Sequence, residues 1–573
     1  MIAFTSWLWL FAGASTAGLV KLRDASSSEP IAVTKNGSYA GVYDGVYKQD
    51  YFLGVPYALP PTGERRFKVP TSLNGTWTGT RDAKSYSKEC VGDQWSYETS
   101  EDCLYLNVVR PSGYENTKLP VAFWIHGGGY RQGGGVDQRY NLSFIVQNSV
   151  EIGKPIIGVS INYRLSAWGF LYSRKMKGSG NTNLGLRDQR LALHWLRENA
   201  EGFGGDPDKV TIFGESAGGS SVGFHLTAYN GRDDKLFRAA AMESGNPVAY
   251  FALKTSEWYQ PLYNAISAQA GCNTTLNSLE CLRSVPFETL NNIINGTTTA
   301  SDGTPLRSAF MPTVDGDFIA RYTSLQLADG SFVKVPIISG ANSDEGTAFS
   351  PQRINTTTGF SNSLLNPALP PGSSIPPSLL PSLLTAYPDD PSVNVIASLN
   401  QTRPPQPYGP QYRRAASYYG DAIFIAARRL TCATWASHNI TAYCYRFNAI
   451  TANVNSVVAV THFQEVAFVF GNIQGVGYAP LNRNPFEGRG EATVALARFV
   501  CSSWVGFVSD LDPNGWREGA GWKGREVAWP RYDVGNPMNI VLDANVSSYA
   551  EPDTYRAEGM KLINDNNFGV YRR

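Results

Sequence analysis

The sequence predicts an α/β fold in which helices flank a large central sheet that is mixed but mostly parallel. Short apolar runs rich in β-branched residues alternate along the chain with segments of helical spacing. The runs lack the polar alternation of a half-exposed strand, which is typical of strands that helices cover on both faces. A serine between glycines also follows one of these runs directly, at a predicted strand-to-helix turn. The predicted strands are Val121–Ile125, Ile156–Ile161, Val210–Phe213, Val335–Ile338 and Tyr443–Phe447.

A helix is predicted from Leu186 to Asn199, where apolar side chains recur at helical spacing among Arg, Asp and Glu. The stretch from Asn366 to Pro391 is rich in Pro and Ser, so we interpret it as an irregular surface excursion. The chain has no internal repeat and no obvious linker between independent domains. Residues 18–573 are therefore expected to form one domain.

The composition fits a large packed globule. Of the 573 residues, 42% are apolar, 12% are aromatic and 17% are charged, which is unlike a disordered chain. The formal net charge is +1, and Lys and Arg are spread along the sequence. A nucleic-acid partner would need a concentrated basic face, so none is expected.

The first 17 residues have the shape of a secretory signal, with a short apolar run followed by small residues and cleavage predicted after Ala17. The segment has no Lys or Arg before the apolar run. The alternative is a membrane anchor, but the run is well short of the ~20 residues that a spanning helix needs. No later stretch is expected to be long enough either. We therefore expect a secreted protein without stable membrane insertion.

Two further features fit secretion. Asn-x-Ser/Thr sequons, the acceptors of N-glycosylation, occur nine times. Of the seven cysteines, Cys90 lies close to Cys103 and Cys272 lies close to Cys281, and an oxidising compartment would bridge such pairs. Because seven is odd, at least one of the other three stays free or pairs outside the chain. These are Cys432, Cys444 and Cys501; the sequons are at Asn36, Asn74, Asn141, Asn273, Asn295, Asn355, Asn400, Asn439 and Asn545.

The motif that carries chemistry is Gly214-Glu215-Ser216-Ala217-Gly218, which follows a predicted buried strand and precedes a helical stretch. This is the setting of a nucleophile elbow. Glycines two residues either side of Ser216 avoid a clash at the sharp bend. The bend lifts the hydroxyl clear of the backbone and places the next N–H groups at a helix N-terminus, which favours negative charge. The buried strand before it argues against a Gly/Ser loop of no consequence.

A second motif, His126-Gly127-Gly128-Gly129, directly follows the strand Val121–Ile125. Its glycines let the main chain approach a ligand with bare N–H groups. Hydrolases with a nucleophile elbow build an oxyanion hole from such a loop and the N–H after the nucleophile, here Ala217. One preorganised donor lowers the barrier by about 3–4 kcal/mol. The alternative, a flexible glycine turn, does not explain its position.

The serine needs a base, and the chain has five histidines. In enzymes with this elbow the order is serine, acid, histidine, which leaves His438 and His462. His438 precedes a sequon and is expected in an exposed turn. His462 follows the apolar run Val457–Val460, and a loop just after a strand is where a catalytic base belongs. His462 is therefore the predicted base; the alternative is a hydrogen-bonded core histidine.

The acid should follow a strand between these two residues. Ser343-Asp344-Glu345-Gly346 comes after Val335–Gly340. Either carboxylate of this segment can orient the imidazole and stabilise the imidazolium. The residues alone do not choose between Asp344 and Glu345.

Two long segments, Glu101–Pro111 and Phe203–Gly219, resemble the carboxylesterase/lipase/cholinesterase family, the type-B carboxylesterases. The similarity extends over roughly Ser38 to Tyr532, and it looks most like a fungal-style secreted esterase. Shorter matches are Phe52–Ala58, Asn162–Arg164, Pro312–Gly316 and Trp529-Pro530.

The resemblance implies the α/β-hydrolase fold, with Ser216 as nucleophile, His462 as base and Glu345 as acid. It places the oxyanion donors on Gly128, Gly129 and Ala217, and it implies no metal and no organic cofactor. The implied mechanism passes through an acyl-enzyme that water then hydrolyses. It also implies two disulfides and two structural ion pairs: Cys90–Cys103, Cys272–Cys281, Arg66 with Glu101, and Arg164 with Asp188.

The partner is expected to be a small-molecule ester. In similar lipases the first disulfide loop is a long apolar lid, but here only 12 mostly polar residues separate Cys90 from Cys103. This predicts an open esterase for soluble or short-acyl esters; the alternative is a lipase or sterol esterase on long-chain lipid esters.

Pocket candidates are Trp95, in the same loop, and Glu215, beside the nucleophile. Cholinesterases place a tryptophan in the corresponding loop, where it holds a quaternary ammonium, but a pocket-mouth aromatic is the simpler interpretation of Trp95. A non-catalytic adhesion protein of the same fold is a further alternative. Such proteins have lost a triad residue, whereas Ser216, Glu345 and His462 are all present.

Overall fold

The structure is a computed structural model of the protein. It describes residues 29–573 except 93–96, 301–302, 370, 373–374, 395–401, 453, 480–482, 523 and 525. The predicted signal peptide, Trp95 and the sequon at Asn400 lie outside the described residues.

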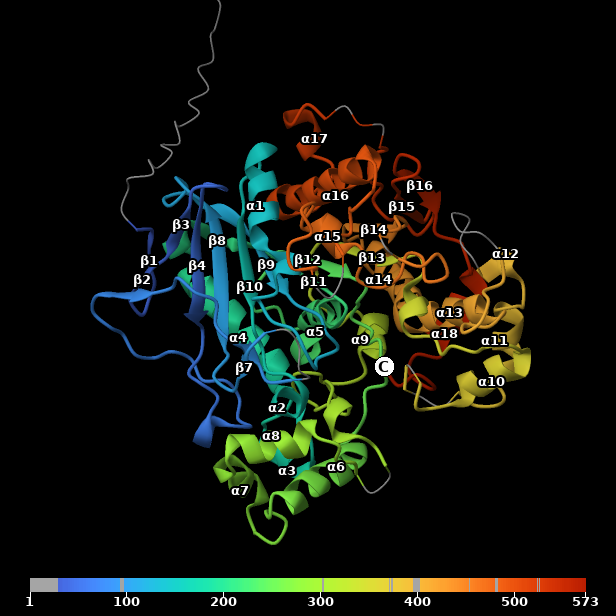
Figure 1. The fold of residues 1–573 in the computed structure, drawn as a ribbon, viewed down its shortest axis with the longest axis horizontal. Helices are drawn as coiled ribbons and strands as arrows, with labels where there is room; N and C mark the ends of the chain where they lie inside the picture. Colours follow the sequence, from blue (N-terminus) through green and yellow to red (C-terminus); the bar gives the residue numbers. More distant parts are fainter. Residues whose placement is uncertain are drawn as a thin grey trace, which may run out of the picture.

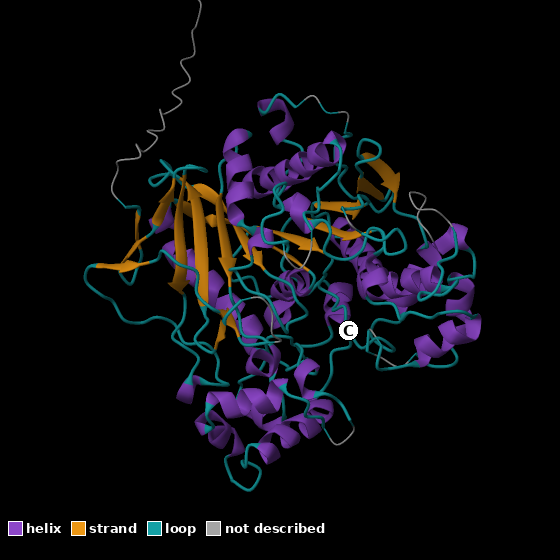
Figure 2. Cartoon of the chain, in the orientation of Figure 1, coloured by secondary structure: helices purple, strands orange, loops and turns teal. Residues whose placement is uncertain are grey.

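An eleven-stranded sheet runs through the molecule in the order β16-β15-β14-β13-β12-β11-β9-β10-β8-β4-β3 (Figures 1 and 2). The neighbouring strands from β10 to β15 are parallel, and the strands at both edges are antiparallel. The predicted mixed, mostly parallel sheet is therefore confirmed. Its strands are β3 (Val42–Asp44), β4 (Gln49–Pro56), β8 (Tyr105–Pro111), β9 (Leu119–Ile125), β10 (Ile157–Ile161), β11 (Gly205–Glu215), β12 (Ala239–Glu243), β13 (Ile337–Asn342), β14 (Ala442–Phe447), β15 (Met538–Leu542) and β16 (Tyr549–Pro552).

Two small sheets lie apart from the central one. The first joins β1, β2 and β5, and the second pairs β6 with β7 next to the first disulfide. Their bounds are β1 (Ile31–Val33), β2 (Ser38–Ala40), β5 (Thr80–Asp82), β6 (Glu89–Cys90) and β7 (Thr99–Ser100).

The predicted strands fall on β9, β10, β11, β13 and β14. The run that begins at Val335 enters the sheet only at Ile337, because Pro336 has no N–H to donate to a ladder. The predicted helix is α4, which spans Leu184–Asn199.

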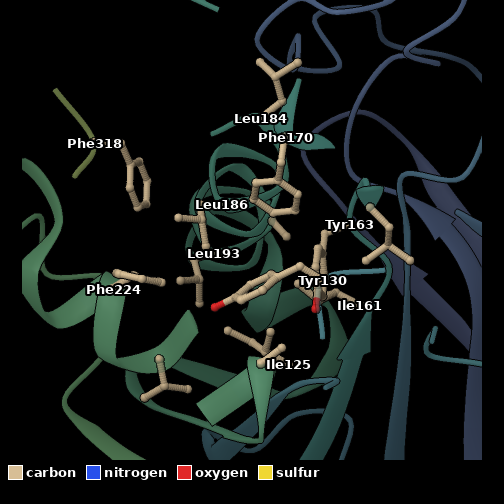
Figure 3. Close-up of a cluster of buried hydrophobic side chains, with 14 of the residues drawn as sticks. Ile125, Tyr130, Ile161, Tyr163, Phe170, Leu184, Leu186, Leu193, Phe224 and Phe318 are labelled. Atoms are coloured by element: carbon tan, nitrogen blue, oxygen red, sulfur yellow. The ribbon is translucent and has the colours of Figure 1, made fainter. Parts of the chain in front are cut away.

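Helices cover both faces of the sheet. Along β9, Val121, Phe123 and Ile125 face one apolar core, whereas Ala122 and Trp124 face the other. The first core contains side chains of α4 and α5, and Figure 3 shows part of it. The second contains side chains of α1 and α16, which lie on the opposite side of the sheet in Figure 1. Burial on both faces explains why this strand lacks polar alternation.

The helices that have not been given above are as follows. The α-helices are α1 (Leu142–Glu151), α2 (Ser166–Phe170), α3 (Arg174–Gly178), α5 (Ala217–Gly231), α6 (Ser256–Gln269), α7 (Ser278–Ser284), α8 (Phe287–Asn295), α9 (Thr323–Asp329), α10 (Thr357–Leu365), α11 (Leu380–Ala386), α12 (Pro391–Asn394), α13 (Tyr412–Gly420), α14 (Ala426–Ser437), α15 (Val466–Val469), α16 (Glu491–Asp510), α17 (Trp516–Gly519) and α18 (Ala557–Asp565). A π-helix, η6, spans Asp421–Ile425. Short 3-10 turns are η1 (Gly63–Arg65), η2 (Gln138–Tyr140), η3 (Ala200–Phe203), η4 (Leu306–Ser308) and η5 (Glu345–Ala348).

Two expectations from the sequence are wrong in part. The stretch from Asn366 to Pro391 contains the helix α11, in which Pro381 occupies the first turn, where its missing N–H is not needed. The 20-residue helix α16 is long and apolar enough to span a membrane by length and composition, although no later stretch was expected to be. Of its most apolar 18-residue window 72% is buried in the protein, as in the core helix of a folded domain.

The structure contains three disulfides. Cys90–Cys103 and Cys272–Cys281 are the pairs that the resemblance implies, and Cys432 pairs with Cys444. The odd cysteine is Cys501, a buried free thiol in α16.

Both implied ion pairs are also formed, and both are bidentate. Arg66 donates to Glu101 at 2.7 Å through Nε and through Nη2. Arg164 donates to Asp188 at 2.8 and 2.6 Å, and these two side chains are only 4% and 0% exposed. A buried carboxylate that loses its partner is left without compensation for its lost hydration.

We predict that Arg164→Met lowers the free energy of unfolding by about 3–5 kcal/mol, because it leaves the Asp188 carboxylate buried and unpaired. Urea denaturation followed by far-UV circular dichroism measures the change. The control is Lys35→Met, which breaks the exposed pair with Glu198 and should leave the free energy nearly unchanged. Equal effects of the two variants would contradict this prediction.

Candidate active site

The serine of the Gly-x-Ser-x-Gly motif occupies a sharp bend between β11 and α5. Ser216 has φ 59° and ψ −121°, a conformation that costs a non-glycine residue about 1–3 kcal/mol. Two backbone hydrogen bonds hold the bend: the N–H of Ser216 donates to Glu243 O, and the N–H of Ser220 donates to Ser216 O, both at 2.9 Å. A Cβ on Gly218 would lie 2.0 Å from the carbonyl oxygen of Ile125. Only glycine therefore lets β9 pass this close to the elbow.

The glycine loop after β9 packs against the elbow. A Cβ on Gly127 would lie 2.6 Å from Glu215 O and 3.1 Å from the Cβ of Ser216. The preceding His126 is fully buried and stacks on Tyr163, with ring centroids 4.4 Å apart. The Tyr163 hydroxyl also donates to the carbonyl of His126 at 2.8 Å. Burial lowers the pKa of His126 to about 4, so it anchors the loop as a neutral ring.

The three predicted oxyanion donors are backbone N–H groups of the glycine loop and of the first residue of α5. Gly128 and Gly129 have φ of 95° and 65°, and Ala217 begins α5. Among the residues that the structure describes, none accepts a hydrogen bond from the N–H of Gly128, Gly129 or Ala217. Bare N–H groups at a helix N-terminus and in a glycine loop favour a negatively charged oxygen.

The structure brings Glu345, not Asp344, to the imidazole of His462. The Nδ1–H of His462 donates to Oε2 of Glu345 at 2.7 Å. Glu345 is fully buried in η5, just after β13, and its Oε1 accepts from the N–H of Asn342 at 2.7 Å and from the hydroxyl of Ser244. This carboxylate therefore has little freedom to turn away from the ring.

Asp344 holds the loop that leads to His462. Its side chain pairs with Arg413 at 3.0 Å and accepts from the N–H of Val460 at 3.2 Å, while its own N–H donates to the carbonyl of Val460 at 2.9 Å. The role is structural, and sequence reasoning did not assign it.

The run Val457–Val460 is a turn and not a strand, so the expected strand just before His462 is wrong. The nearest preceding strand is β14, which ends at Phe447. Asn455 explains the turn, because its side chain accepts from the N–H of Val457 and its carbonyl accepts from those of Val458 and Ala459. Because these N–H groups already donate to Asn455, they cannot donate to a neighbouring strand. His438 lies in an exposed position after α14, as expected.

The second imidazole nitrogen faces the elbow. The Nε2 of His462 lies 3.1 Å from Oε1 of Glu215, the residue directly before Ser216. The contact lacks hydrogen-bond geometry, and Oε1 of Glu215 has no hydrogen-bond partner among the described residues. Within that part of the chain, no hydrogen bond joins the Ser216 hydroxyl to His462 either. Catalytic hydrogen bonds are often long or poorly aligned until substrate binds.

Four buried glutamates cluster at the site, and three of them, Glu215, Glu345 and Glu465, act on the imidazole of His462. Besides Glu215 and Glu345, Glu465 accepts from Ser244 at 3.0 Å and from the side chain of Asn342 at 2.6 Å. Glu243 accepts from Trp504 at 2.8 Å through one oxygen, and the other has no partner among the described residues. Burial raises the pKa of Glu215, Glu243 and Glu465, and repulsion between neighbouring glutamates raises it further. Neither Glu243 nor Glu465 was predicted, although Glu465 follows the predicted base, His462, by only three residues.

This acidic surrounding controls the proton affinity of the imidazole. Burial alone would lower the pKa of His462, but Glu215, Glu345 and Glu465 outweigh burial and raise it to about 9. The three carboxylates therefore favour the protonated form of the imidazole.

Two aromatic rings contact the imidazole of His462, and a third packs against one of them. The ring of Phe424, in η6, lies parallel to the imidazole, with centroids 4.8 Å apart and an interplanar angle of 11°. Phe349 meets the imidazole edge-on at 5.1 Å, and Tyr250 contacts Phe424 at 5.6 Å. No local sequence pattern distinguishes these residues from core aromatics.

No metal-ion site was predicted. Among the residues that the structure describes, no group of three or more His, Cys, Asp or Glu side chains is arranged to hold a metal ion.

A mixed sheet flanked by helices, with a serine on the bend between β11 and α5, defines an α/β-hydrolase. Residues 28–558 match the carboxylesterase family, and the chain belongs to this family. The chain is a carboxylic ester hydrolase.

Similar proteins agree with this class. The chain is 33% identical to "Secreted lipase 1" of Botryotinia fuckeliana, over 97% of each chain. It is 34% identical to "Lipase 2" of Diutina rugosa, over 96% of this chain and 98% of the relative. The crystal structure of Aspergillus niger EstA superimposes with a TM-score of 0.78 at 27% identity, over 95% of this chain and 99% of that one. A structure titled "PNB esterase" gives a TM-score of 0.72 at 26% identity, over 93% and 100%.

We predict that Glu215→Gln moves the acidic limb of the kcat/KM profile to lower pH by about 1–3 units, the effect of removing an opposite charge at contact distance. The sign follows because Glu215 raises the pKa of His462, and only the neutral imidazole can act as a base. The measurement is kcat/KM for a soluble p-nitrophenyl ester over a series of pH values, from which the apparent pKa of the acidic limb is fitted.

The matched control is Glu243→Gln, because Glu243 lies opposite Glu215 on the neighbouring strand. This control should move the limb far less. A limb that stays in place in Glu215→Gln would show that Glu215 does not hold the proton on His462.

Proposed function

We propose that the protein hydrolyses carboxylic esters through an acyl-enzyme, with Ser216 as nucleophile, His462 as base and Glu345 as the acid that orients the base. Gly128, Gly129 and Ala217 supply the oxyanion hole. The observation that carries the proposal is the 2.7 Å hydrogen bond that the imidazole of His462 donates to Glu345, while its other nitrogen faces the elbow.

The chemistry has two halves. As the hydroxyl of Ser216 attacks the ester carbonyl, His462 takes its proton, and the carbonyl oxygen becomes an oxyanion beside the three free N–H groups. The imidazolium then protonates the leaving alcohol. In the second half His462 takes a proton from water, the resulting hydroxide attacks the acyl carbon, and the acid leaves while the proton returns to Ser216. Glu345 keeps Nδ1 protonated throughout, so that Nε2 is the nitrogen that accepts.

We predict that Ser216→Ala lowers kcat by at least ~10³ while the protein stays folded. The control is Ser220→Ala, one turn further along α5, whose buried hydroxyl has no hydrogen-bond partner among the described residues. The release of p-nitrophenol from p-nitrophenyl butyrate measures kcat for both variants. A fluorophosphonate should label the wild type and Ser220→Ala but not Ser216→Ala.

Retention of more than about 1% of wild-type kcat in Ser216→Ala would reject the assigned nucleophile. Failure of the wild type to react with the fluorophosphonate would favour the non-catalytic alternative.

The substrate class that we propose is soluble esters with short to medium acyl chains. The loop from Cys90 to Cys103 closes after 13 positions and is fixed at both ends. β6 pairs with β7, and Glu101 is held by Arg66. A loop so short and so anchored offers no large apolar flap. The alternative is a lipase for long-chain esters, and the names of the fungal relatives favour it.

We predict that turnover in a p-nitrophenyl series from acetate to palmitate peaks at short to medium chains. The physical reason is that no lid has to open on a lipid surface. The companion measurement is hydrolysis of a triglyceride below and above its solubility limit. A steep rise in activity above that limit would support the lipase alternative instead.

Secretion is part of the proposal. It is supported by the disulfides, by the N-terminal signal pattern and by relatives whose names include the word "secreted". One sequon is not suited to carry a glycan: Asn36 is 8% exposed, and its Nδ2 donates to the carbonyls of Leu73 and Gly75 at 2.8 and 2.9 Å.

A further inference from the structure

The orientation of His462 depends on a short irregular helix. The parallel ring of Phe424 belongs to η6, the π-helix between α13 and α14. A π-helical turn inside an α-helix is rare and is found mostly at functional sites. Because the Phe424 ring lies flat on the imidazole, a shift of this backbone would carry the ring away from His462.

One arginine holds the start of this helix. Arg556 donates to both carboxylate oxygens of Asp421, each at 2.7 Å, and the pair is buried. The hydroxyl of Tyr387 adds a third hydrogen bond to Asp421 at 2.9 Å. This contact fixes the first residue of η6 to the segment that leads into α18.

A second arginine, Arg573, contacts the next residue of η6, Ala422, and also the separate backbone segment that contains Ala249. Nη1 of Arg573 donates to the carbonyl of Ala422 at 2.5 Å and to the carbonyl of Ala249 at 3.4 Å. Its Nε donates to the side chain of Asn567 at 2.8 Å. Ala422 precedes Phe424 by two residues, and Ala249 directly precedes Tyr250, which packs against Phe424. One guanidinium therefore joins the two backbone segments that carry the aromatic cover of the imidazole.

The fold places this side chain deep in the molecule. The end of the chain, marked C in Figure 1, lies beside α9 and α18. There the hydroxyl of Ser324 donates to the carbonyl of Arg573, and the N–H of Leu253 donates to the carbonyl of Arg572 at 2.8 Å. The neighbouring Tyr571 is buried, with its hydroxyl 3.1 Å from that of Tyr418.

Burying the charged side chain of Arg573 costs more free energy than apolar packing alone would require. Its side chain is fully buried, and no Asp or Glu of the described residues pairs with it. Its Nη2 has no hydrogen-bond partner there either, and burial lowers the pKa of the guanidinium to about 10. An apolar side chain would avoid the cost of burying this charge without an acidic partner.

We propose that Arg573 is a positioning residue for ester hydrolysis: through the carbonyls of Ala422 and Ala249, it holds Phe424 flat against His462. This inference rests on the proposed role of His462 as the base. It assigns Arg573 no contact with substrate.

A double-mutant cycle tests the proposal. The variants are Arg573→Met, Phe424→Leu and the two combined, assayed with p-nitrophenyl butyrate. Each single change should lower kcat about tenfold with KM within about twofold of wild type, because displacement of a catalytic group slows the chemistry more than it weakens binding. In the Phe424→Leu background, Arg573→Met should change kcat by less than about twofold, because both act through the same ring.

The pH profile gives a second readout that a purely structural residue would not move. Loss of the ring cover exposes the imidazole to water, which changes both influences on its pKa: the burial that lowers it and the neighbouring glutamates that raise it. The acidic limb of kcat/KM should therefore move in both single variants, in the same direction and by a similar amount. The matched control is Arg572→Met, the exposed neighbour, whose backbone carbonyl still accepts from Leu253; it should leave kcat and the limb unchanged.

The proposal would be overturned if the fold-loss of kcat in the double variant equalled the product of the two single losses. It would also be overturned if Arg573→Met lowered the melting temperature but left kcat unchanged. If Arg573→Met does not fold, the same cycle with Arg573→Lys decides, since lysine keeps a charge and a donor but lacks the planar fork. Activity that survives His462→Ala would reject the assigned base itself. A failed cycle in an enzyme that His462→Ala inactivates rejects only the role of Arg573.

Discussion

The hydrogen bond between Glu345 and His462 depends on most of the fold. Glu345 stands just after β13, and the backbone N–H of Asn342 and the hydroxyl of Ser244 fix its other oxygen. His462 lies at the end of a long loop after β14, and Asp344 holds that loop by backbone and side chain. Two adjacent residues thus perform different tasks, one orienting the imidazole and the other holding the chain that carries it. Both positions follow from neighbouring parallel strands that end at the same edge of the sheet.

The same edge concentrates negative charge. Because β11, β12 and β13 end side by side, Glu215, Glu243 and Glu345 meet there, and Glu465 joins them from the loop. Buried carboxylates are costly unless they are hydrogen-bonded, paired or protonated. Ser244, Asn342 and Trp504 supply hydrogen bonds, and the imidazole supplies a positive partner when it is protonated. In the proposed mechanism the cluster therefore opposes the step in which His462 must be neutral, while it stabilises the imidazolium that would form as Ser216 attacks.

The sequence predicted the features that rest on local pattern. β9 could be assigned because its apolar residues face two cores, and Ser216 because glycines and a buried strand define its turn. The choice of Glu345 over Asp344 required the family resemblance, since both side chains have the same chemistry. The strand predicted at Val457–Val460 was wrong because hydrogen bonds to Asn455 fold this apolar segment into a turn. Phe424 and Arg573 could not be assigned, because they reach the site from helices and a chain end whose packing no periodicity reveals.

The thiol of Cys501 has a consequence for how the enzyme is lost on heating. In the folded protein the sulfur is sealed in α16, and burial raises its pKa far above the ordinary value, so it does not attack the three disulfides. Unfolding removes that protection and presents a nucleophilic sulfur to the cystines of the same chain. Exchange then yields mispaired chains that do not refold on cooling, so time spent hot governs the survival of the enzyme more than its equilibrium stability does.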